Sequence, residues 1–374
     1  MSAFRPILIG LQTLLLALTL TMTLISGPAF AQATGARGEY FTYRFVPCDI
    51  LLTLSQRFTQ NQENWKIIRK INGIADQYKI PVGFELKIPF SLIDEIPATA
   101  TVSHLRGQAF LNGSPITQTG GQISEGAVIT TGANSNVTLT LPDNSKVLVP
   151  VNSSVTAKRL QRFSGTGYID AIFTIDRGEV QSHVNPGGNG VGRFEIRTPV
   201  SVTGVRGTIL RAGTRQDQSA YSTIIKGQAD FSQADGVALT RLGNNQGVVT
   251  NGAGQLSGTR ALLPPPVLHP MGAQSHNREL RFDPVPGAVA YELVLAEDSE
   301  GYDVLWSQHI TGTTATLPAV RNGTVYVMVR SLDQQMLAGA QAVLQIEQTL
   351  NTVNDRQGSP IGVGNGDYLL QSAF

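Results

Sequence analysis

The chain has 374 residues and a formal net charge of +1; 41% of its residues are hydrophobic, 15% are charged and 39 are glycine. This length predicts two or three domains, and the low charge with many glycines favours turn-rich β modules over helical bundles or disordered chain. Because the chain has no excess of basic residues, a nucleic acid is not expected as a partner.

The N-terminus has the pattern of a secretory signal. Arg5 precedes the apolar stretch "ILIGLQTLLLALTLTMTLI", and small residues follow, with Ala29 and Ala31 at the spacing that a signal peptidase reads. We expect residues 1–31 to be removed on export, so that a periplasmic or otherwise exported chain begins at or near Gln32. The apolar stretch is nearly long enough to span a bilayer, so an uncleaved signal that anchors the protein in the inner membrane is the alternative.

Residues 40–90 read as two short strands that enclose two helices. The segment 40–46 alternates as a strand, Asp49 is a plausible N-cap, Gly73 is a plausible C-cap, and "ELKIP" closes the segment as a strand. The residues expected on the helix faces are Leu51, Leu54, Phe58, Trp65, Ile68 and Ile71. Tyr43 and Trp65 are expected in the core rather than at a ligand.

The segments "YRFVPCDILLTLSQRF", "NWKIIRKINGI" and "IPVGFELKIP" resemble a LysM module. That family binds N-acetylglucosamine polymers, which implies peptidoglycan as the ligand, held in a shallow groove between two loops. Carried over to this chain, the groove residues are Asp49, Ile50, Leu51, Gly73, Ile74, Ile80 and Pro81. Ile74 and Ile80 would contact sugar faces.

The first groove loop departs from the family pattern. Cys48 stands where glycine is usual, and Ile50 stands where threonine is usual. A folded spacer that has lost its ligand is therefore the alternative for this module. Cys48 is the one cysteine of the chain, so it makes no internal disulfide, and we expect a small, partly buried side chain.

Residues 102–256 alternate as strands between frequent turn signals such as "PDNS" and "VNSS". Val137 and Leu139 alternate before the first of these turns, and Val147 and Val149 alternate after it. This pattern predicts an all-β domain of strand repeats, either a sandwich or solenoid-like.

The stretch "RTPVSVTGVRGTILRAG" changes its alternation partway along. Val202 lies on an even position and Val205 on an odd one, and a strand places every second side chain on one face. We therefore predict a β-bulge at Gly204 and a close backbone approach at Gly207. Arg206 would bind carbonyls or an acid across neighbouring turns, or contact a partner instead.

The segments "GQISEGAVITTGANSNVTLTLPDNSKVLVPVNSSV", "IFTIDRGEVQSHV" and "RFEIRTPVSVTGVRGT" resemble a FecR domain. The residues of its closing motif, to which we assign a structural role, are Thr198, Pro199, Gly204, Arg206, Gly207 and Thr208. One departure is Asn144 in place of the usual hairpin glycine; asparagine tolerates the left-handed conformation, so the turn is expected to survive.

Residues 267–347, after the proline-rich linker "GTRALLPPPVLHP", resemble a fibronectin type III-like sandwich. Its expected strands are marked by the alternating residues Tyr291, Leu293, Leu295, Val325, Val327 and Val329, and Phe282 replaces the tryptophan that is usual in the first core strand. Residues 348–374 are expected to form a flexible tail that docks onto this sandwich.

The sequence offers no catalytic or metal-binding constellation. None of the five histidines has ligand spacing with other metal-binding residues, and "GGNGVG" is not followed by a helix, so it is not a dinucleotide motif. Asp170, Asp176 and Glu179 are expected to be solvated surface acids. We expect no enzyme activity, no metal and no cofactor.

The expected fold is mainly β and multidomain: a small β-α-α-β LysM module, a FecR domain of strand repeats and a C-terminal β-sandwich. The leading hypothesis is a non-catalytic cell-envelope protein that binds peptidoglycan through LysM and presents a FecR-type β surface to an unidentified envelope protein. The alternative is a periplasmic FecR-type sensor in transmembrane signalling. That family architecture has an N-terminal cytoplasmic domain, and the segment before the apolar stretch is short, which favours the leading hypothesis.

Overall fold

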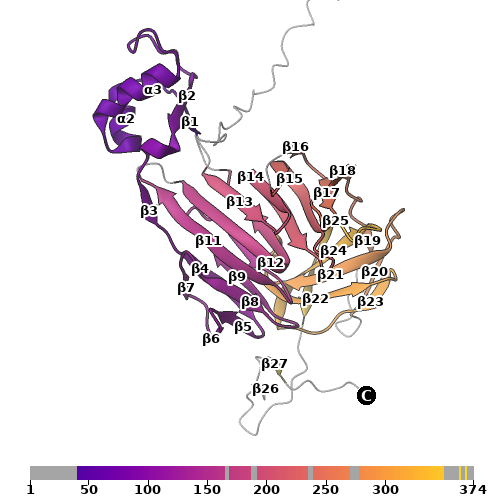
Figure 1. Ribbon diagram of the computed structural model, residues 1–374. Coiled ribbons are helices and arrows are strands. Elements are labelled where there is room, and N and C mark those ends of the chain that lie inside the picture. The colour runs from indigo at the N-terminus through magenta and orange to yellow at the C-terminus, as the bar shows by residue number, and fades with distance from the viewer. Residues whose placement is uncertain are drawn as a thin grey trace, which may run out of the picture. The chain divides into compact units, whose positions relative to one another are not determined.

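The computed structural model describes residues 40–164, 168–186, 192–234, 239–269, 278–348, 362–363 and 367–368 (Figure 1). The predicted secretory signal, most of the "GGNGVG" loop and nearly all of the predicted tail lie outside this part of the chain. All of the described residues belong to one compact unit, residues 33–374. The described chain is mainly β, as the sequence predicts. No helix among the described residues is long and apolar enough to cross a membrane.

The first elements follow the predicted β-α-α-β order. Strand β1 (Tyr40–Arg44) pairs antiparallel with β2 (Glu85–Pro89). Between them lie α2 (Leu51–Thr59), the 3-10 turn η1 (Gln62–Asn64) and α3 (Trp65–Ile71).

Both helices direct their predicted apolar residues inward, with one exception. Leu51, Leu54, Phe58 and Ile68 are buried, and Trp65 packs partly buried against them. Ile71 is 38% exposed, because it is the last residue of the short, seven-residue helix α3.

A sheet of 16 strands follows, with the main strand order β18-β17-β15-β14-β13-β12-β10-β9-β4-β7 (Figure 1). Its strands are β3 (Glu95–Pro97), β4 (Ala100–Arg106), β5 (Ala109–Leu111), β6 (Ser114–Ile116), β7 (Gln122–Ile123), β8 (Val128–Thr131), β9 (Asn136–Thr140), β10 (Lys146–Val149), β11 (Ser154–Phe163), β12 (Ile169–His183), β13 (Arg193–Arg197), β14 (Ser201–Thr214), β15 (Ala220–Gln233), β16 (Leu239–Leu242), β17 (Gln246–Thr250) and β18 (Leu256–Ala261). The short turn η2 (Phe90–Leu92) leads into it from β2.

The core of this sheet is built from the alternating residues that the sequence indicates. Val137, Leu139, Val147 and Val149 are fully buried, and β9 pairs with β10 through the predicted hairpin. Asn144 takes a left-handed φ of 65° in that hairpin, which is the conformation expected for it.

The irregularity in β14 lies three residues beyond its predicted position. Gly204 pairs in regular register with Glu195 on one side and Asp230 on the other. The register with β15 shifts instead between Arg206 and Leu210, and Gly207 has a left-handed φ of 55°. The prediction of a bulge at Gly204 is therefore wrong. The change in which alternate residues are apolar shows that the register shifts somewhere in the strand, but it does not show at which residue.

The C-terminal part contains two sheets that share one core. One has β19 (Leu268–His269), β20 (Glu279–Phe282) and β23 (Thr314–Thr316) in the order β19-β20-β23. The other has β21 (Ala290–Ala296), β22 (Val304–Ile310), β24 (Gly323–Leu332) and β25 (Ala338–Gln348) in the order β22-β21-β24-β25. Phe282 from the first sheet meets Tyr291 from the second edge-on, with ring centroids 4.8 Å apart.

Candidate functional site

The two loops of the predicted glycan groove lie side by side. The Phe45 N–H donates to the Phe84 carbonyl at 2.9 Å, and the Gly83 N–H donates to the Phe45 carbonyl at 2.8 Å. These bonds join Phe45, just before the loop that carries Ile50, to Gly83, just after Val82; the Val82 and Ile50 side chains are 65% and 50% exposed. Two large apolar side chains thus face solvent at adjacent loops, which is the property that a weak sugar-binding surface needs.

Several predicted groove residues serve the fold instead. Leu51 is fully buried in the helix core, and Ile74 and Ile80 pack against the same core. Gly73 follows α3 with a left-handed φ of 63°, as a C-cap glycine does. Pro81 and Val82, the last two residues of the second predicted groove loop, are exposed.

The first loop also differs from its prediction. The N-cap of α2 is Ile50, which makes no side-chain cap bond, so the prediction of Asp49 as the cap is wrong. The Asp49 carboxylate accepts the Val46 N–H at 2.7 Å and closes the loop. Cys48 is exposed rather than partly buried and has a left-handed φ of 72°, a conformation that suits glycine better.

This helical region shares its core with the large sheet. Phe90 stacks on Phe163 of β11 with ring centroids 4.4 Å apart, and Phe41 lies 5.4 Å from the ring of Tyr168, just before β12. Phe163 is buried in the same cluster as Phe58. A fragment cut after the helical region would expose this aromatic contact, so binding experiments require the longer chain.

The predicted FecR motif forms a turn and a bulge, and its polar side chains make hydrogen bonds within the fold. The Thr198 hydroxyl accepts the Ser201 N–H at 3.0 Å in the turn that contains Pro199. Thr208, also buried, donates to the Gln228 carbonyl at 2.8 Å. These bonds support the structural role assigned to the motif. The Arg206 side chain lies outside the described part, so its predicted contacts stay a prediction.

Asp170 is not the solvated acid that the sequence suggests. Its side chain is fully buried, and it accepts hydrogen bonds from Arg159 and Arg193, the latter at 2.7 Å between Nε and Oδ1. Arg193 lies opposite Asp170 because β12 and β13 run parallel in this register. Asp176, on the same strand, is exposed as predicted.

One cross-strand row of the large sheet lies against the C-terminal part, and residues outside this row, such as Lys146 and Arg215, contact that part as well. The register aligns His104 (β4), Thr138 (β9), Leu148 (β10), Gln181 (β12), Arg211 (β14) and Thr223 (β15). We call these six residues the docking row. His104 Nε2 lies 2.9 Å from the Val304 carbonyl oxygen, and Thr138 donates to the Tyr302 carbonyl.

The centre of the docking row is charged and buried. Arg211 donates to Gln181 at 3.0 Å, and Arg330 of β24 donates to the same Gln181 oxygen at 3.2 Å. Arg330 also pairs with Glu292 at 2.9 Å. Burial, followed by the charge of Arg330, lowers the pKa of Arg211 to about 10. Burial alone would raise the pKa of Glu292, but Arg330 and Arg211 outweigh it and the pKa is lowered.

Glu179 is a further acid in this network, and it accepts a hydrogen bond from Tyr221. Burial, followed by the Glu292 carboxylate, raises the pKa of Glu179. A carboxyl group whose pKa is raised in the folded state opposes folding once pH exceeds its unfolded value. The sequence-based expectation of a solvated surface acid is therefore wrong for Glu179.

We expect Glu179→Gln to unfold at a higher temperature than the wild type at pH 8, because glutamine keeps an acceptor for Tyr221 and removes a charge that is partly buried. The advantage should shrink as the pH is lowered to 5, because the raised pKa of Glu179 lets a falling pH protonate the carboxylate and remove the same charge. Thermal melts at the two pH values measure this, with Asp176→Asn as the exposed control. An advantage that is equal at both pH values would contradict the assignment.

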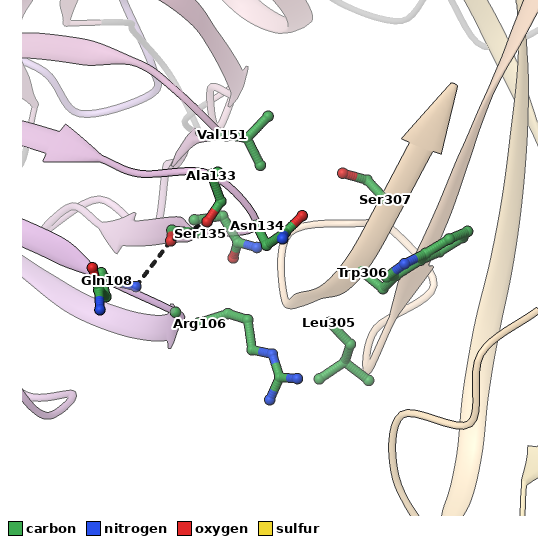
Figure 2. Close-up of a pocket in the computed structure, with 11 residues that line it drawn as sticks. Arg106, Gln108, Ala133, Asn134, Ser135, Val151, Leu305, Trp306 and Ser307 are labelled. Atoms are coloured by element: carbon green, nitrogen blue, oxygen red, sulfur yellow. Dashed lines mark hydrogen bonds between the residues drawn. The ribbon is translucent and has the colours of Figure 1, made fainter. Parts of the chain in front are cut away.

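A pocket of about 460 Å³ opens beside the His104 end of the docking row (Figure 2). One wall comes from the end of β4 and the loop before β9, and the other from β22. The lining residues are Arg106, Gly107, Gln108, Ala133, Asn134, Ser135, Asn136, Val151, Leu305, Trp306 and Ser307. Figure 2 shows Arg106 and Leu305 directed toward each other, while the Trp306 ring points away from the opposite wall. Sequence patterns did not indicate this pocket.

The described residues contain no group of three or more His, Cys, Asp or Glu side chains that could hold a metal ion. Residues 127–230, from just before β8 to within β15, match the protein-family model described as "FecR protein". A search of curated proteins gave no match.

Among solved structures, two crystal structures of a candidate anti-sigma factor from Parabacteroides distasonis ATCC 8503 are similar at 16% sequence identity, with a TM-score of 0.30. Each alignment covers 36% of this chain and 59% of the other, so this chain spans under two thirds of that protein's length.

Proposed function

We propose that this protein is an exported, non-enzymatic regulator of the FecR type, whose large sheet presents a surface to a protein partner in the cell envelope. The observation that carries the proposal is the family match over residues 127–230. FecR domains act as periplasmic sensors that pass a signal from an outer-membrane receptor toward a cytoplasmic sigma factor, and we infer a role of this kind here.

We expect deletion of the gene to change the transcription of a small, defined set of genes, and the wild-type gene to restore it. Complementation with Asp170→Ala should fail, because the large sheet loses its buried ion cluster, whereas Asp176→Ala should succeed. RNA sequencing of the parent, the deletion strain and the three complemented strains measures this outcome. Unchanged transcription after deletion would rule out the regulatory role.

A second activity, binding of peptidoglycan, is favoured by the exposed Ile50 and Val82 on adjoining loops. The resemblance to LysM modules supplies the ligand class, N-acetylglucosamine polymers. Binding through this surface would hold the protein at the cell wall while the large sheet engages its partner.

The exported chain is expected to co-sediment with purified peptidoglycan, with a weak affinity of roughly 100 μM or above for one shallow site. The double variant Ile50→Asp/Val82→Asp should stay in the supernatant, and Leu239→Asp, at an equally exposed apolar residue outside these loops, should sediment like the wild type. Chitin oligomers should compete, and added salt should matter little because the chain is nearly neutral. Retention of binding in the double variant would exclude this surface.

A further inference from the structure

Strand β22 forms an open edge of the C-terminal sheet. It stands first in the order β22-β21-β24-β25, and among the described residues it pairs with β21 alone. In an antiparallel strand, every second residue turns its N–H and C=O away from the neighbouring strand. The Val304 carbonyl is contacted by His104, and no described strand pairs with the outer edge over residues 305–310. This edge therefore offers main-chain donors and acceptors to a ligand.

The edge also lacks the residues that usually keep an open strand from pairing. Such strands commonly carry lysine, proline or another charged residue. Residues 305–310 contain no proline, Lys, Arg, Asp or Glu, whereas β25, at the opposite edge of the sheet, carries Glu347. The register with β21 shifts at Leu305, and residues 306–310 are in regular register. This regular stretch is suitable for pairing with a further strand.

The pocket beside the docking row opens onto the start of this edge. Leu305, Trp306 and Ser307 all line it, although alternate residues of a strand point to opposite faces. Figure 2 shows the Trp306 ring pointing away from the opposite wall, so the main chain at Trp306 forms this part of the pocket. The pocket therefore reaches the backbone edge of β22. Its volume of about 460 Å³ lies in the range of sites that hold one small molecule.

The wall opposite β22 is fixed by contacts of its own. Gly107 has a left-handed φ of 71°, and a Cβ there would lie 2.5 Å from the Ser135 hydroxyl oxygen, so the two loops of this wall are in direct contact. The Ser135 hydroxyl accepts the Gln108 N–H and donates to the Ala133 carbonyl, each at 2.9 Å. A site fixed in this way loses little conformational entropy when a ligand enters.

The same wall contains a buried acceptor without a donor. Asn136 lines the pocket and is 4% exposed, and its side-chain oxygen has no hydrogen-bond partner among the described atoms. A buried acceptor without a donor is unfavourable, and an N–H group of a ligand would remove this cost. Apart from Arg106, every lining residue is uncharged. We therefore derive the ligand from hydrogen bonding and not from charge.

We propose that this pocket and the outer edge of β22 bind an extended, uncharged segment of another protein, which adds to the sheet as a further strand. The segment has main-chain N–H and C=O groups for the edge and an N–H group for Asn136. Main-chain hydrogen bonds give affinity in complexes of this kind, and contacts of alternate side chains give specificity. Leu305 and Val151 supply the apolar contacts here. The proposal goes beyond the regulatory role and does not depend on it.

The first measurement asks whether the edge is open. Hydrogen exchange of the full exported chain, read residue by residue, should be fast at about every second amide of residues 306–310. Slow exchange at all of these amides in the protein alone would mean that its own tail or a second copy already covers the edge. That result would overturn the proposal.

The second measurement tests the class of ligand. The probe acetyl-Thr-Val-Ser-Val-Thr-amide is compared with the same sequence in which the main-chain amides are N-methylated, which removes the N–H donors. In an NMR titration the first peptide should bind with a Kd of about 1 mM and slow the exchange of the edge amides. The N-methylated peptide should bind at least about tenfold more weakly, because it cannot donate to the edge or to Asn136.

Variants then assign the binding to this site. Ser307→Trp should abolish binding by filling the pocket, and Asn136→Leu should weaken it by about fivefold or more because the acceptor is lost. Val343→Trp adds the same ring to an exposed position of β25, at the opposite edge of the sheet, and should bind like the wild type. Circular dichroism checks folding, and Ser307→Trp decides the matter if Asn136→Leu does not fold.

Four results would overturn the proposal. They are no binding of the unmodified peptide at about 10 mM, equal binding of the two peptides, protection by the bound peptide only outside residues 305–310, and folded pocket variants that bind like the wild type. The exchange measurement locates the bound peptide on the wild-type chain, so the proposal stays testable if neither pocket variant folds.

Discussion

Replacing Asp170 with alanine is expected to lower the free energy of unfolding by about 3 kcal/mol. The carboxylate is fully buried between Arg159 and Arg193, so its removal leaves two neighbouring guanidinium groups that share Glu95, the partner of Arg159, as their remaining counter-charge. The expected cost stands at the lower end of the range for a broken buried ion pair, because both arginine side chains remain about one third exposed and can recruit water.

Asp176→Ala is the matched control, since Asp176 lies on the same strand with its side chain in solvent. Its hydrogen bond to Thr156 is long, at 3.3 Å, and its loss should cost less than about 0.5 kcal/mol. Urea unfolding followed by fluorescence gives both values. Equal stability of the two variants would mean that the Asp170 cluster contributes nothing to the fold.

Gly207→Val is expected to be destabilised by about 3 kcal/mol, while Gly204→Val should be nearly neutral. At Gly207 the backbone has a left-handed φ, which a β-branched residue resists, and a new Cβ would lie 2.8 Å from the Pro186 Cβ atom. At Gly204 a Cβ meets only the Asp230 carbonyl oxygen within 4 Å, at 3.9 Å.

The two glycines lie on the same strand of the same motif, so the comparison isolates backbone conformation and space from sequence context. Thermal melts of both variants provide the measurement. If Gly204→Val were the less stable variant, the bulge would lie at Gly204, as the alternation pattern predicts. That result would contradict the observed register.

Local patterns predicted the elements better than they predicted the burial of polar residues. The spacing of Leu51, Leu54 and Phe58 identifies the buried face of α2, because helical periodicity is a property of the segment itself. The docking row has no such signal. Gln181 and Arg211 stand at positions where alternation indicates a solvent face, and that face is covered by residues more than a hundred positions later in the chain.

The candidate binding surfaces show the same limit. A resemblance to known modules located the loop that contains Ile50, but it also selected Leu51, Ile74 and Ile80, which the helical core uses. The pocket at Arg106 joins residues about two hundred positions apart, so no local motif could have revealed it.

The docking row also bears on how the chain is made. Its contacts join His104 to Val304, Thr138 to Tyr302 and Gln181 to Arg330, at sequence separations of 200, 164 and 149 residues. Contacts of such high sequence separation form late and slow the overall folding rate. During synthesis, Arg211 therefore stays exposed to solvent until the last third of the polypeptide has been made. A truncated chain that ends before Arg330 would leave the docking row, with Arg211 at its centre, exposed to solvent. We expect quality-control proteases to degrade such a chain preferentially.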